Sequence, residues 1–443
     1  MSLAAPDIPT SYGRVLRFAV PIMLANATVP ILGMVDTAVV GQLGHAAPIG
    51  AVGLGAAVVA SVLWIFGFLR MGTSGLAAQA IGARDGVEST AILLRALLIG
   101  AGAGVAIALL QPLLVWAALA LSPGSAEVEN LAAAYMEIRF WGAPAAIAQY
   151  ALTGWLIAAE RSRAVLAIQF CMNGLNILLD LGFVLGLGWG VEGVALATLI
   201  AEWAGLALGL WLCRDSFGFA FGPAMARLWE KTAMLRMLVV NVDILIRSVL
   251  LQISFMVFLF VAAGESDAIL AANQVLWQFL VITAAVLDGF AFAAEALVGQ
   301  AVGARSQAGV HRAVRVPSIC GLVCVLIMAA FTALCGPWLI DLMTTSAEVR
   351  EVARQYLPWL VLAPIGGIAA WMLDGIYIGA TMTREMRQSM LISTAIYLAC
   401  LLALPPLWGN HGLWAAMMVL NMARGVTMLR YWPQLDRRAT GLA

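Results

Sequence analysis

The sequence predicts an all-α polytopic membrane protein, with twelve transmembrane helices arranged in two pseudo-symmetric six-helix bundles. Three observations support this fold class: the composition, the number of long apolar segments and an internal repeat. Of the 443 residues, 63% are hydrophobic and only 11% are charged, and the mean hydropathy is +0.96. Soluble proteins carry roughly a quarter charged residues. A chain with so few charges can present this much apolar surface only to lipid.

The apolar segments are long enough to cross a bilayer, because a spanning helix needs ~20 apolar residues. Several exceed that length, which indicates tilt or kinks. Met1 to Thr10 shows no basic region ahead of a short apolar core. We therefore expect no removable signal peptide and insertion of the first helix itself. With Gly, Pro and charge clusters as boundaries, the predicted spans are 14–43, 49–80, 89–121, 127–158, 163–186, 190–212, 235–263, 266–300, 308–342, 346–379, 384–404 and 410–433.

The charges of the loops predict the orientation of these spans. Arginines concentrate before the first span, in the even-numbered loops and in the C-terminal tail, as at Arg161 and Arg163. The odd-numbered loops are poor in arginine and often acidic, as at Glu127 and Glu129, with one mixed exception around Arg350. By the positive-inside rule, both termini and all even-numbered loops are predicted to lie in the cytoplasm.

An internal repeat divides the chain. The string LAAQAIGAR at 76–84 returns as LVGQAVGAR at 297–305, an offset of 221 with six of nine positions identical. The same offset pairs Tyr135 with Tyr356. Because each repeat holds an even number of helices, the repeats are predicted to be parallel, related by an axis along the membrane normal, with the substrate in the cleft between them. The predicted parts are an N-terminal bundle at 1–212, a cytoplasmic linker at 213–232 and a C-terminal bundle at 233–443.

Asp36 stands alone in the stretch GMVDTAVVGQLG, as the only formal charge between Phe18 and Leu69. An ionised aspartate at the centre of a membrane helix costs about 2.5–3.5 kcal/mol. Burial favours the neutral form of such a group, which makes it a natural proton carrier. The offset of 221 aligns Asp36 with Val257, so the packing of the bundle does not require a charge there. Asp36 is thus a candidate for function, and a structural hydrogen-bonded carboxyl is the alternative.

The fifth predicted helix carries Asn173, Asn176 and Asp180 at i, i+3 and i+7, which places them on one face. A carboxylate one turn from a carboxamide can hold a proton in a defined hydrogen bond or help to ligate a hard cation through oxygens. The alternative is a polar clamp between helices, worth only ~1 kcal/mol.

Two prolines, Pro21 and Pro30, precede Asp36 in the first helix. Proline removes a backbone hydrogen bond and can kink a helix. A kink whose angle depends on the protonation of Asp36 is one interpretation, and a static bend is the other.

The second half carries its own charges. Asp243 and Arg247 stand at i, i+4 in the seventh helix, a spacing that favours an ion pair. Asp288 and Glu295 in the eighth helix and Asp374 in the tenth line the cleft or pair with arginines such as Arg70, and the sequence does not decide between these roles. All three carboxylates lack a counterpart in the first half.

Several function classes are disfavoured. The zero net charge argues against a nucleic-acid partner, and no Walker sequence is present for ATP hydrolysis. The six cysteines and three histidines are scattered and show no metal-ligand spacing, so no metal centre and no cofactor is predicted. The driving force of a transporter with this sequence is then an ion gradient.

Specific strings resemble the MATE (multidrug and toxic compound extrusion) family. They are Pro21 followed by Asp36, the related ends of the second and eighth helices, and the N..LD of the fifth helix. NVDILIRSVLLQISF, LDGFAFAAEALVGQAVGAR and LDGIYIGATMTREMRQSM look like its DinF-like branch. The resemblance implies two bundles in a V, alternating access, and export of organic, often cationic drugs against protons or sodium.

The resemblance also assigns roles to residues. It implies a kinking proline at Pro21 and a coupling site in the N-terminal bundle. At another polar position of the fourth helix, some members have an asparagine where this chain has Thr153. The remaining positions implied for the site are Asp36, Tyr135, Asn176, Asp180 and Thr198.

We therefore expect a monomeric exporter of small organic, often cationic or amphipathic compounds in the bacterial inner membrane, coupled to protons. One alternative is sodium coupling, with Na⁺ held by Asp36, Asn176, Asp180 and Thr198. The other is a flippase for a lipid-linked precursor, which would favour a cleft ringed with arginines.

Overall fold

The computed structural model describes residues 10–42, 46–122, 124–218 and 220–441. Within these ranges every regular element is a helix. The all-α fold predicted from the composition is confirmed. The absence of a removable signal peptide and the position of the two termini rest on residues outside these ranges, as does the predicted end of the first span at residue 43.

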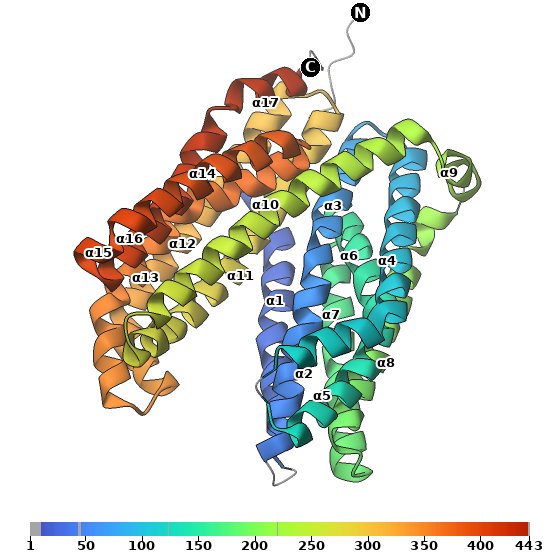
Figure 1. The fold of residues 1–443 in the computed structure, drawn as a ribbon. Coiled ribbons are helices and arrows are strands. Elements are labelled where there is room, and N and C mark those ends of the chain that lie inside the picture. The colour runs from blue at the N-terminus through green and yellow to red at the C-terminus, as the bar shows by residue number, and fades with distance from the viewer. Residues whose placement is uncertain (1–9, 43–45, 123, 219, 442–443) are drawn as a thin grey trace, which may run out of the picture. The chain divides into compact units, whose positions relative to one another are not determined.

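The helices of the first repeat run from α1 to α8, and several of them lie side by side in Figure 1. Helix α4 packs on α6, α7 packs on α8, and α5 packs on α2 and α8. The bounds are α1 (Tyr12–Gly41), α2 (Ala46–Trp64), η1 (Ile65–Gly67), α3 (Phe68–Gly82), α4 (Gly86–Ala120), α5 (Ala126–Arg139), η2 (Phe140–Gly142), α6 (Ala143–Ala158), α7 (Ser162–Asp180), η3 (Leu181–Gly186) and α8 (Gly190–Leu212).

The predicted linker region contains two short elements, and the second repeat follows it. Helix α11 packs on α12 and α13, and α16 packs on α13 and α14. The bounds are η4 (Arg214–Phe217), α9 (Phe221–Arg227), α10 (Lys231–Ala263), α11 (Asp267–Gly303), α12 (Gln307–Met343), α13 (Ala347–Gly379), α14 (Thr383–Ala403), α15 (Pro405–Trp408), α16 (Asn410–Leu429) and α17 (Trp432–Ala439).

Eleven stretches of helix in the described residues are long and apolar enough to cross a membrane. The one predicted span that is not among these eleven, 127–158, is present as α5, η2 and α6, so it is interrupted at Phe140–Gly142. Gly142 has a low helix propensity, and Pro144 lies in the first turn of α6, a position that proline favours. The chain therefore tightens into a 3₁₀ turn and starts a new helix.

The internal repeat predicted from the sequence is present in the backbone. Arg84 and Arg305, 221 positions apart, both end a helix in the left-handed conformation, with φ of 60° and 52°. The next residue donates its N–H five residues back in both copies, to Ala80 and Ala301, each at 3.0 Å. This is the Schellman ending of a helix. The pair Glu160 and Thr381, at the same offset, repeats the left-handed conformation at 56° and 51°.

The chain divides into two compact units whose borders do not coincide with those of the repeats. One unit holds the chain up to Met23, the short segment Ile81–Arg84 and everything from Leu238 onward. The other holds Leu24–Ala80 and Asp85–Met237. Helix α1 therefore contributes to both units, with the border between Met23 and Leu24. The division into bundles at 1–212 and 233–443 stays a prediction.

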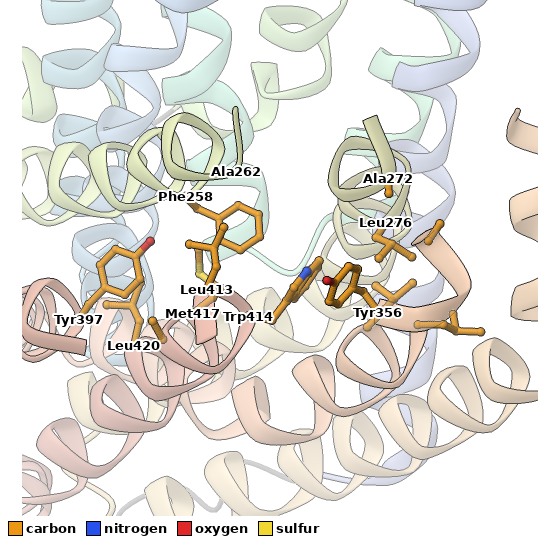
Figure 2. Packing of buried hydrophobic residues seen from close by; sticks show 14 of the residues in the cluster. Phe258, Ala262, Ala272, Leu276, Tyr356, Tyr397, Leu413, Trp414, Met417 and Leu420 are labelled. Atoms are coloured by element: carbon orange, nitrogen blue, oxygen red, sulfur yellow. The ribbon is translucent and has the colours of Figure 1, made fainter. Parts of the chain in front are cut away.

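The unit that holds everything from Leu238 onward, here called the C-terminal unit, has a core rich in aromatic side chains, shown in Figure 2. Phe258 on α10 meets Trp414 on α16 edge to face, with ring centroids 5.2 Å apart, a favoured aromatic geometry. The Trp414 Nε1 donates to Asn273 Oδ1 at 2.9 Å, so its polar atom is satisfied inside this core. Tyr397 donates to the Ser254 carbonyl oxygen at 3.1 Å. These contacts fix α14 and α16 against α10 and α11.

Candidate functional site

Four side chains from three helices meet inside the unit that holds Leu24–Ala80 and Asp85–Met237. They are Asp36 on α1, Asn176 and Asp180 on α7, and Thr198 on α8, and we call them the carboxylate cluster. With its amide nitrogen toward the acids, Asn176 donates to Asp36 Oδ1 at 3.2 Å and to Asp180 Oδ2 at 3.0 Å. Its oxygen then accepts from Thr198 N at 3.2 Å and Oγ1 at 2.9 Å. One amide thus bridges two carboxylates and a third helix.

The opposite orientation of the Asn176 amide also finds a partner. Its nitrogen then donates to Thr198 Oγ1 at 2.9 Å, and its oxygen faces the two acids. Because a carboxylate only accepts hydrogen bonds and a protonated carboxyl also donates, the first orientation suits ionised acids and the second suits protonated ones. The Thr198 hydroxyl is close enough to the Val194 carbonyl, at 3.0 Å, to donate to it when Asn176 supplies a donor.

The polar face of α7 turns inward, as its spacing predicts. Asp180 is fully buried, and Asn173 and Asn176 are buried with it. Asn173 donates to Thr28 Oγ1 on α1 at 2.7 Å, so the two helices are joined at a second point. The carboxyl groups of Asp36 and Asp180 lie within hydrogen-bonding reach of each other. The Oδ1 of Asp180 is buried and accepts no hydrogen bond from the described part of the chain.

Helix α7 changes its winding directly after Asp180. The segment η3 is a π-helix, and Leu187 N donates to the Gly182 carbonyl at 3.0 Å to close its wide turn. π-Turns are rare and are found frequently at functional sites. The sequence predicted an unbroken span over 163–186 and gave no signal for this change.

The two prolines do not break α1, which is helical from Tyr12 to Gly41. Pro21 is half-buried and Pro30 is exposed. The border between the two compact units crosses α1 between Met23 and Leu24, just after Pro21. A protonation-dependent bend at this proline stays a prediction.

The other residues implied for the site lie on neighbouring helices. Tyr135 on α5 is buried, and its ring lies where a Cβ on Gly55 would be. Its phenol interacts electrostatically with both Arg139 and Asp36, which places it beside the carboxylate cluster. Thr153 on α6 is half-buried, and its hydroxyl takes no part in the bridge formed by Asn176.

A buried ion pair lies one helical turn from this cluster. Arg139 Nη1 and Nη2 donate to Glu202 Oε2 and Oε1, each at 2.8 Å, so the pair is bidentate. A Cβ on Gly142 would overlap Glu202 Oε2, so this position can hold only glycine while the carboxylate stays in place. Neither residue is among the site residues predicted from the sequence. The available signal was a second charge of opposite sign inside an apolar segment.

The charged residues of the C-terminal unit pair differently from the prediction. Asp374 on α13 accepts from Arg247 on α10 and from Arg424 Nη2 on α16, the latter at 2.6 Å. The predicted pair of Asp243 with Arg247 is wrong. Asp243 accepts instead from Arg387 on α14 at 2.6 Å.

The physical reason is that an i, i+4 ion pair gains little on its own. Buried charges are stabilised by partners on other helices that complete their hydrogen bonds, and Thr383 supplies a further donor to Asp243 at 3.2 Å. Glu295 on α11 is fully buried, and Asp288 two turns earlier is half-buried. Arg70 on α3 belongs to the other compact unit.

No group of three His, Cys, Asp or Glu in metal-binding geometry occurs among the residues that the structure describes. The carboxylate cluster offers two acids and two neutral oxygens, which is the donor set for a hard monovalent cation as well as for a proton. Which of the two it takes depends on the amide of Asn176 and on the charges around it.

Comparisons with known proteins agree on one family. The residue pattern that defines the MatE family matches 21–181 and 244–405. The DNA damage-inducible protein F of Escherichia coli (strain K12) is 38% identical over 429 residues, which cover 96% of this chain and 93% of that protein. A probable multidrug resistance protein NorM of Pseudomonas aeruginosa is 27% identical over 427 residues, covering 90% of this chain and 84% of that protein.

Solved structures share the fold. The Vibrio cholerae MATE transporter VcmN in its bent form superimposes with a TM-score of 0.88 at 19% identity, covering 97% of this chain and 98% of that one. A MOP superfamily transporter from Pyrococcus furiosus gives a TM-score of 0.82 at 21% identity, covering 98% and 97%. At these identities the likeness concerns the fold.

Proposed function

The chain belongs to the MatE family, whose members are transporters and not enzymes, and on this premise we propose that it exports small organic, often cationic or amphipathic compounds by antiport against protons. The multidrug resistance protein NorM of P. aeruginosa, a relative over most of the chain, supports the substrate class by its name. The similarity to the DNA damage-inducible protein F of E. coli and the many apolar spans support a multi-pass protein of the bacterial inner membrane.

The single observation that best supports proton coupling is the carboxylate cluster. Asp36 and Asp180 approach within hydrogen-bonding reach inside an apolar unit. Two carboxylates this close repel each other, and a shared proton removes the repulsion.

The amide of Asn176 can report the charge of the acids to a third helix. When both acids are ionised, its nitrogen donates to both and its oxygen accepts from Thr198. When they are protonated, the amide turns, its oxygen accepts from a carboxyl, and its nitrogen donates to Thr198 Oγ1. The cost of turning is small because each orientation keeps hydrogen bonds on both sides.

The proposed cycle uses α1 as the moving part. A proton from outside neutralises the cluster, α1 bends near Pro21, and the cavity of the N-terminal bundle closes and expels the compound. Facing the cytoplasm, the cluster loses its proton and accepts a new compound. Pro21 lies inside α1 and cannot donate a backbone hydrogen bond there, which supports a bend at this point. Compound and proton then compete for the same acids, and antiport follows without a separate relay.

The orientation rests on the loop charges. Arginines crowd the even-numbered loops, so we propose that both termini lie in the cytoplasm and that the coupling proton enters from the opposite side. We propose that the chain acts as a monomer.

The flippase alternative is less well supported. A lipid diphosphate needs arginines that are available to it. In the C-terminal unit, Arg247 and Arg424 both bond to Asp374. The proposal therefore keeps organic compounds as the cargo.

Transport into and out of proteoliposomes tests the proposal. Purified protein is reconstituted into proteoliposomes, which are loaded with ethidium. A pH gradient or, separately, a sodium gradient is then imposed across their membrane. We expect a pH gradient to drive ethidium movement in the wild type and Asp36→Asn to abolish it, because asparagine cannot release a proton. Asp215→Asn, an exposed acid in η4, is the matched control and should transport normally. Undiminished pH-driven transport by Asp36→Asn would overturn the role of Asp36.

A further inference from the structure

We infer that Arg139, held in place by Glu202, makes the carboxylate cluster select protons over sodium ions. The inference rests on the proposed function and names a residue pair that sets the coupling ion. It follows from the position of the ion pair, from the charges around it and from the difference between binding a proton and binding a metal cation.

The ion pair shares one helix with the cluster. Thr198 of the cluster and Glu202 stand at i, i+4 on α8, and residues four apart on a helix are neighbours on one face. Tyr135 and Arg139 stand at the same spacing on α5. The pair therefore lies one helical turn along from Thr198 and from Tyr135.

The geometry of the pair is rigid. Two parallel hydrogen bonds at 2.8 Å fix the guanidinium plane against the carboxylate. Both side chains are buried, with exposed fractions of 9% and 12%. The space for Glu202 Oε2 exists only because residue 142 is a glycine. An arginine held in this way cannot swing aside to admit another cation.

The cationic member of the pair acts on an acid of the cluster. Arg139 interacts electrostatically with Asp36, and Glu202 holds Arg139 in place from another helix. Tyr135 interacts electrostatically with Arg139, Asp36 and Glu202. The cluster therefore experiences a fixed cation at one side.

The other groups that face the pair are few. Tyr150 on α6 interacts electrostatically with Glu202 and with Arg70. The remaining acid that faces the cluster is Asp180, on α7. Around the pair, the described charges and phenols are thus the two acids of the cluster, two tyrosines and Arg70.

A fixed cation disfavours both a proton and a sodium ion, but the consequences differ. A proton forms a covalent bond to one oxygen and needs no further ligands. A sodium ion is held only by the negative charge and by several oxygens arranged around it. Proton binding can therefore persist beside the fixed charge of Arg139. Sodium binding depends on electrostatic attraction alone, so a nearby fixed cation weakens it more.

The amide of Asn176 acts in the same direction. With its oxygen bonded to Thr198, it presents N–H groups to both acids. In this orientation N–H groups stand where a sodium ion would need oxygens. The fixed guanidinium and the amide nitrogen then both disfavour a metal cation.

The test compares the wild type with Arg139→Gln/Glu202→Gln, reconstituted as full-length protein in proteoliposomes. Removing both charges avoids leaving one buried charge without a partner. Ethidium transport is driven by a pH gradient or by a NaCl gradient at constant pH. In parallel, NaCl against choline chloride is titrated while the intrinsic tryptophan fluorescence is followed, which reports sodium binding without transport.

We expect the wild type to respond to the pH gradient and to ignore sodium. The double variant should keep pH-driven transport and gain a response to sodium, with an apparent sodium affinity at least about tenfold higher than in the wild type. Arg139→Lys, which keeps the charge and loses the bidentate geometry, should remain insensitive to sodium. Asp85→Asn/Arg227→Gln, a surface pair in the same compact unit, is the control and should behave as the wild type.

Each outcome decides one statement. If the double variant folds, transports with a pH gradient and still ignores sodium in both assays, the inference is wrong and the proposed function stands. Sodium-driven transport by the wild type overturns the inference as well. If the wild type moves ethidium with neither gradient, the proposed function fails. If the double variant does not fold, Arg139→Met/Glu202→Leu, which fills the same space with apolar side chains, replaces it with the same expected gain.

Discussion

Gly154 on α6 lies so close to the carbonyl oxygen of Arg70 on α3 that a Cβ added to it would overlap that oxygen. The same relationship holds 221 residues later, where a Cβ on Gly375 would overlap the carbonyl oxygen of Ala291. Two helices approach closely at the equivalent point of each repeat. Because both repeats have this close approach at the same offset, it is a feature of helix packing in each repeat and is not specific to a substrate site.

Gly154→Ala should therefore destabilise the protein. Forcing a methyl group against backbone atoms costs about 1–3 kcal/mol, because backbone moves less easily than a side chain. The measurement is the unfolding temperature in detergent, which should fall. Gly174→Ala on α7 is the control, because a Cβ there meets nothing within 4 Å. The Gly174→Ala variant should have an unfolding temperature equal to or higher than that of the wild type. Equal unfolding temperatures for Gly154→Ala and the wild type would contradict the prediction.

Asn176→Leu should uncouple the cluster. Leucine has nearly the same size and supplies neither donor nor acceptor, so both acids and Thr198 lose a hydrogen bond at once. We expect pH-driven ethidium transport to fall by about tenfold or more, because an unsatisfied buried acceptor costs ~1–3 kcal/mol. The pH dependence of transport should also move, because the ionised acids lose their donor. Cys171→Ala, exposed on the same helix, should leave both the rate and the pH profile unchanged.

The loop between α3 and α4 gives a pH-dependent prediction. A hydrogen bond from the Glu88 backbone N–H lowers the pKa of Asp85 below its ordinary value, partial burial opposes this, and Arg227 adds to the lowering. A lowered folded pKa means that the ionised form stabilises the folded state. This stabilisation is fully present above the ordinary pKa of 3.8 and is lost as the pH falls through the folded value.

Asp85→Ala should then unfold at a lower temperature than the wild type at pH 7, with a loss of about 1 kcal/mol for the N-cap. The difference between the two should shrink as the pH is lowered toward 3. Ser306 caps α12 at the equivalent point of the second repeat. Its uncharged hydroxyl oxygen accepts a hydrogen bond from Gly309 N at 3.1 Å. Ser306→Ala should cost a similar amount with little dependence on pH. A pH-independent difference for Asp85→Ala would count against the assignment.

Asp374→Ala should be among the most damaging changes in the C-terminal unit. It leaves Arg247 and Arg424 without the carboxylate that both now share. Removing one partner of a buried ion pair costs about 3–5 kcal/mol. The exposed pair of Asp341 with Arg354 is the matched control, and Asp341→Ala should cost about 1 kcal/mol or less. Thermal unfolding of both variants in one detergent measures the difference, and similar losses would refute the ranking.

The sequence predicted the parts of the fold that depend on local pattern. Apolar runs of membrane length define the helices because a bilayer leaves the backbone no other partner for its hydrogen bonds. The offset of 221 is present in the amino-acid sequence, and the left-handed helix ends at Arg84 and Arg305 show the same offset in the backbone. Spacing along α7 was enough to place Asn176 and Asp180 on one face, because helix periodicity is fixed.

The tertiary structure alone decided which charges meet. Glu202 lies 63 residues from Arg139 along the chain, and Arg387 lies 144 residues from Asp243, so no local spacing points to either pair. The π-turn after Asp180 and the orientation of the Asn176 amide likewise depend on neighbours from other helices. The sequence by itself determined that the chain is a membrane protein of two repeats with acidic residues inside its apolar spans. Only the packing of helices decided their partners, because a buried charge is stabilised by whatever the fold brings within hydrogen-bonding distance.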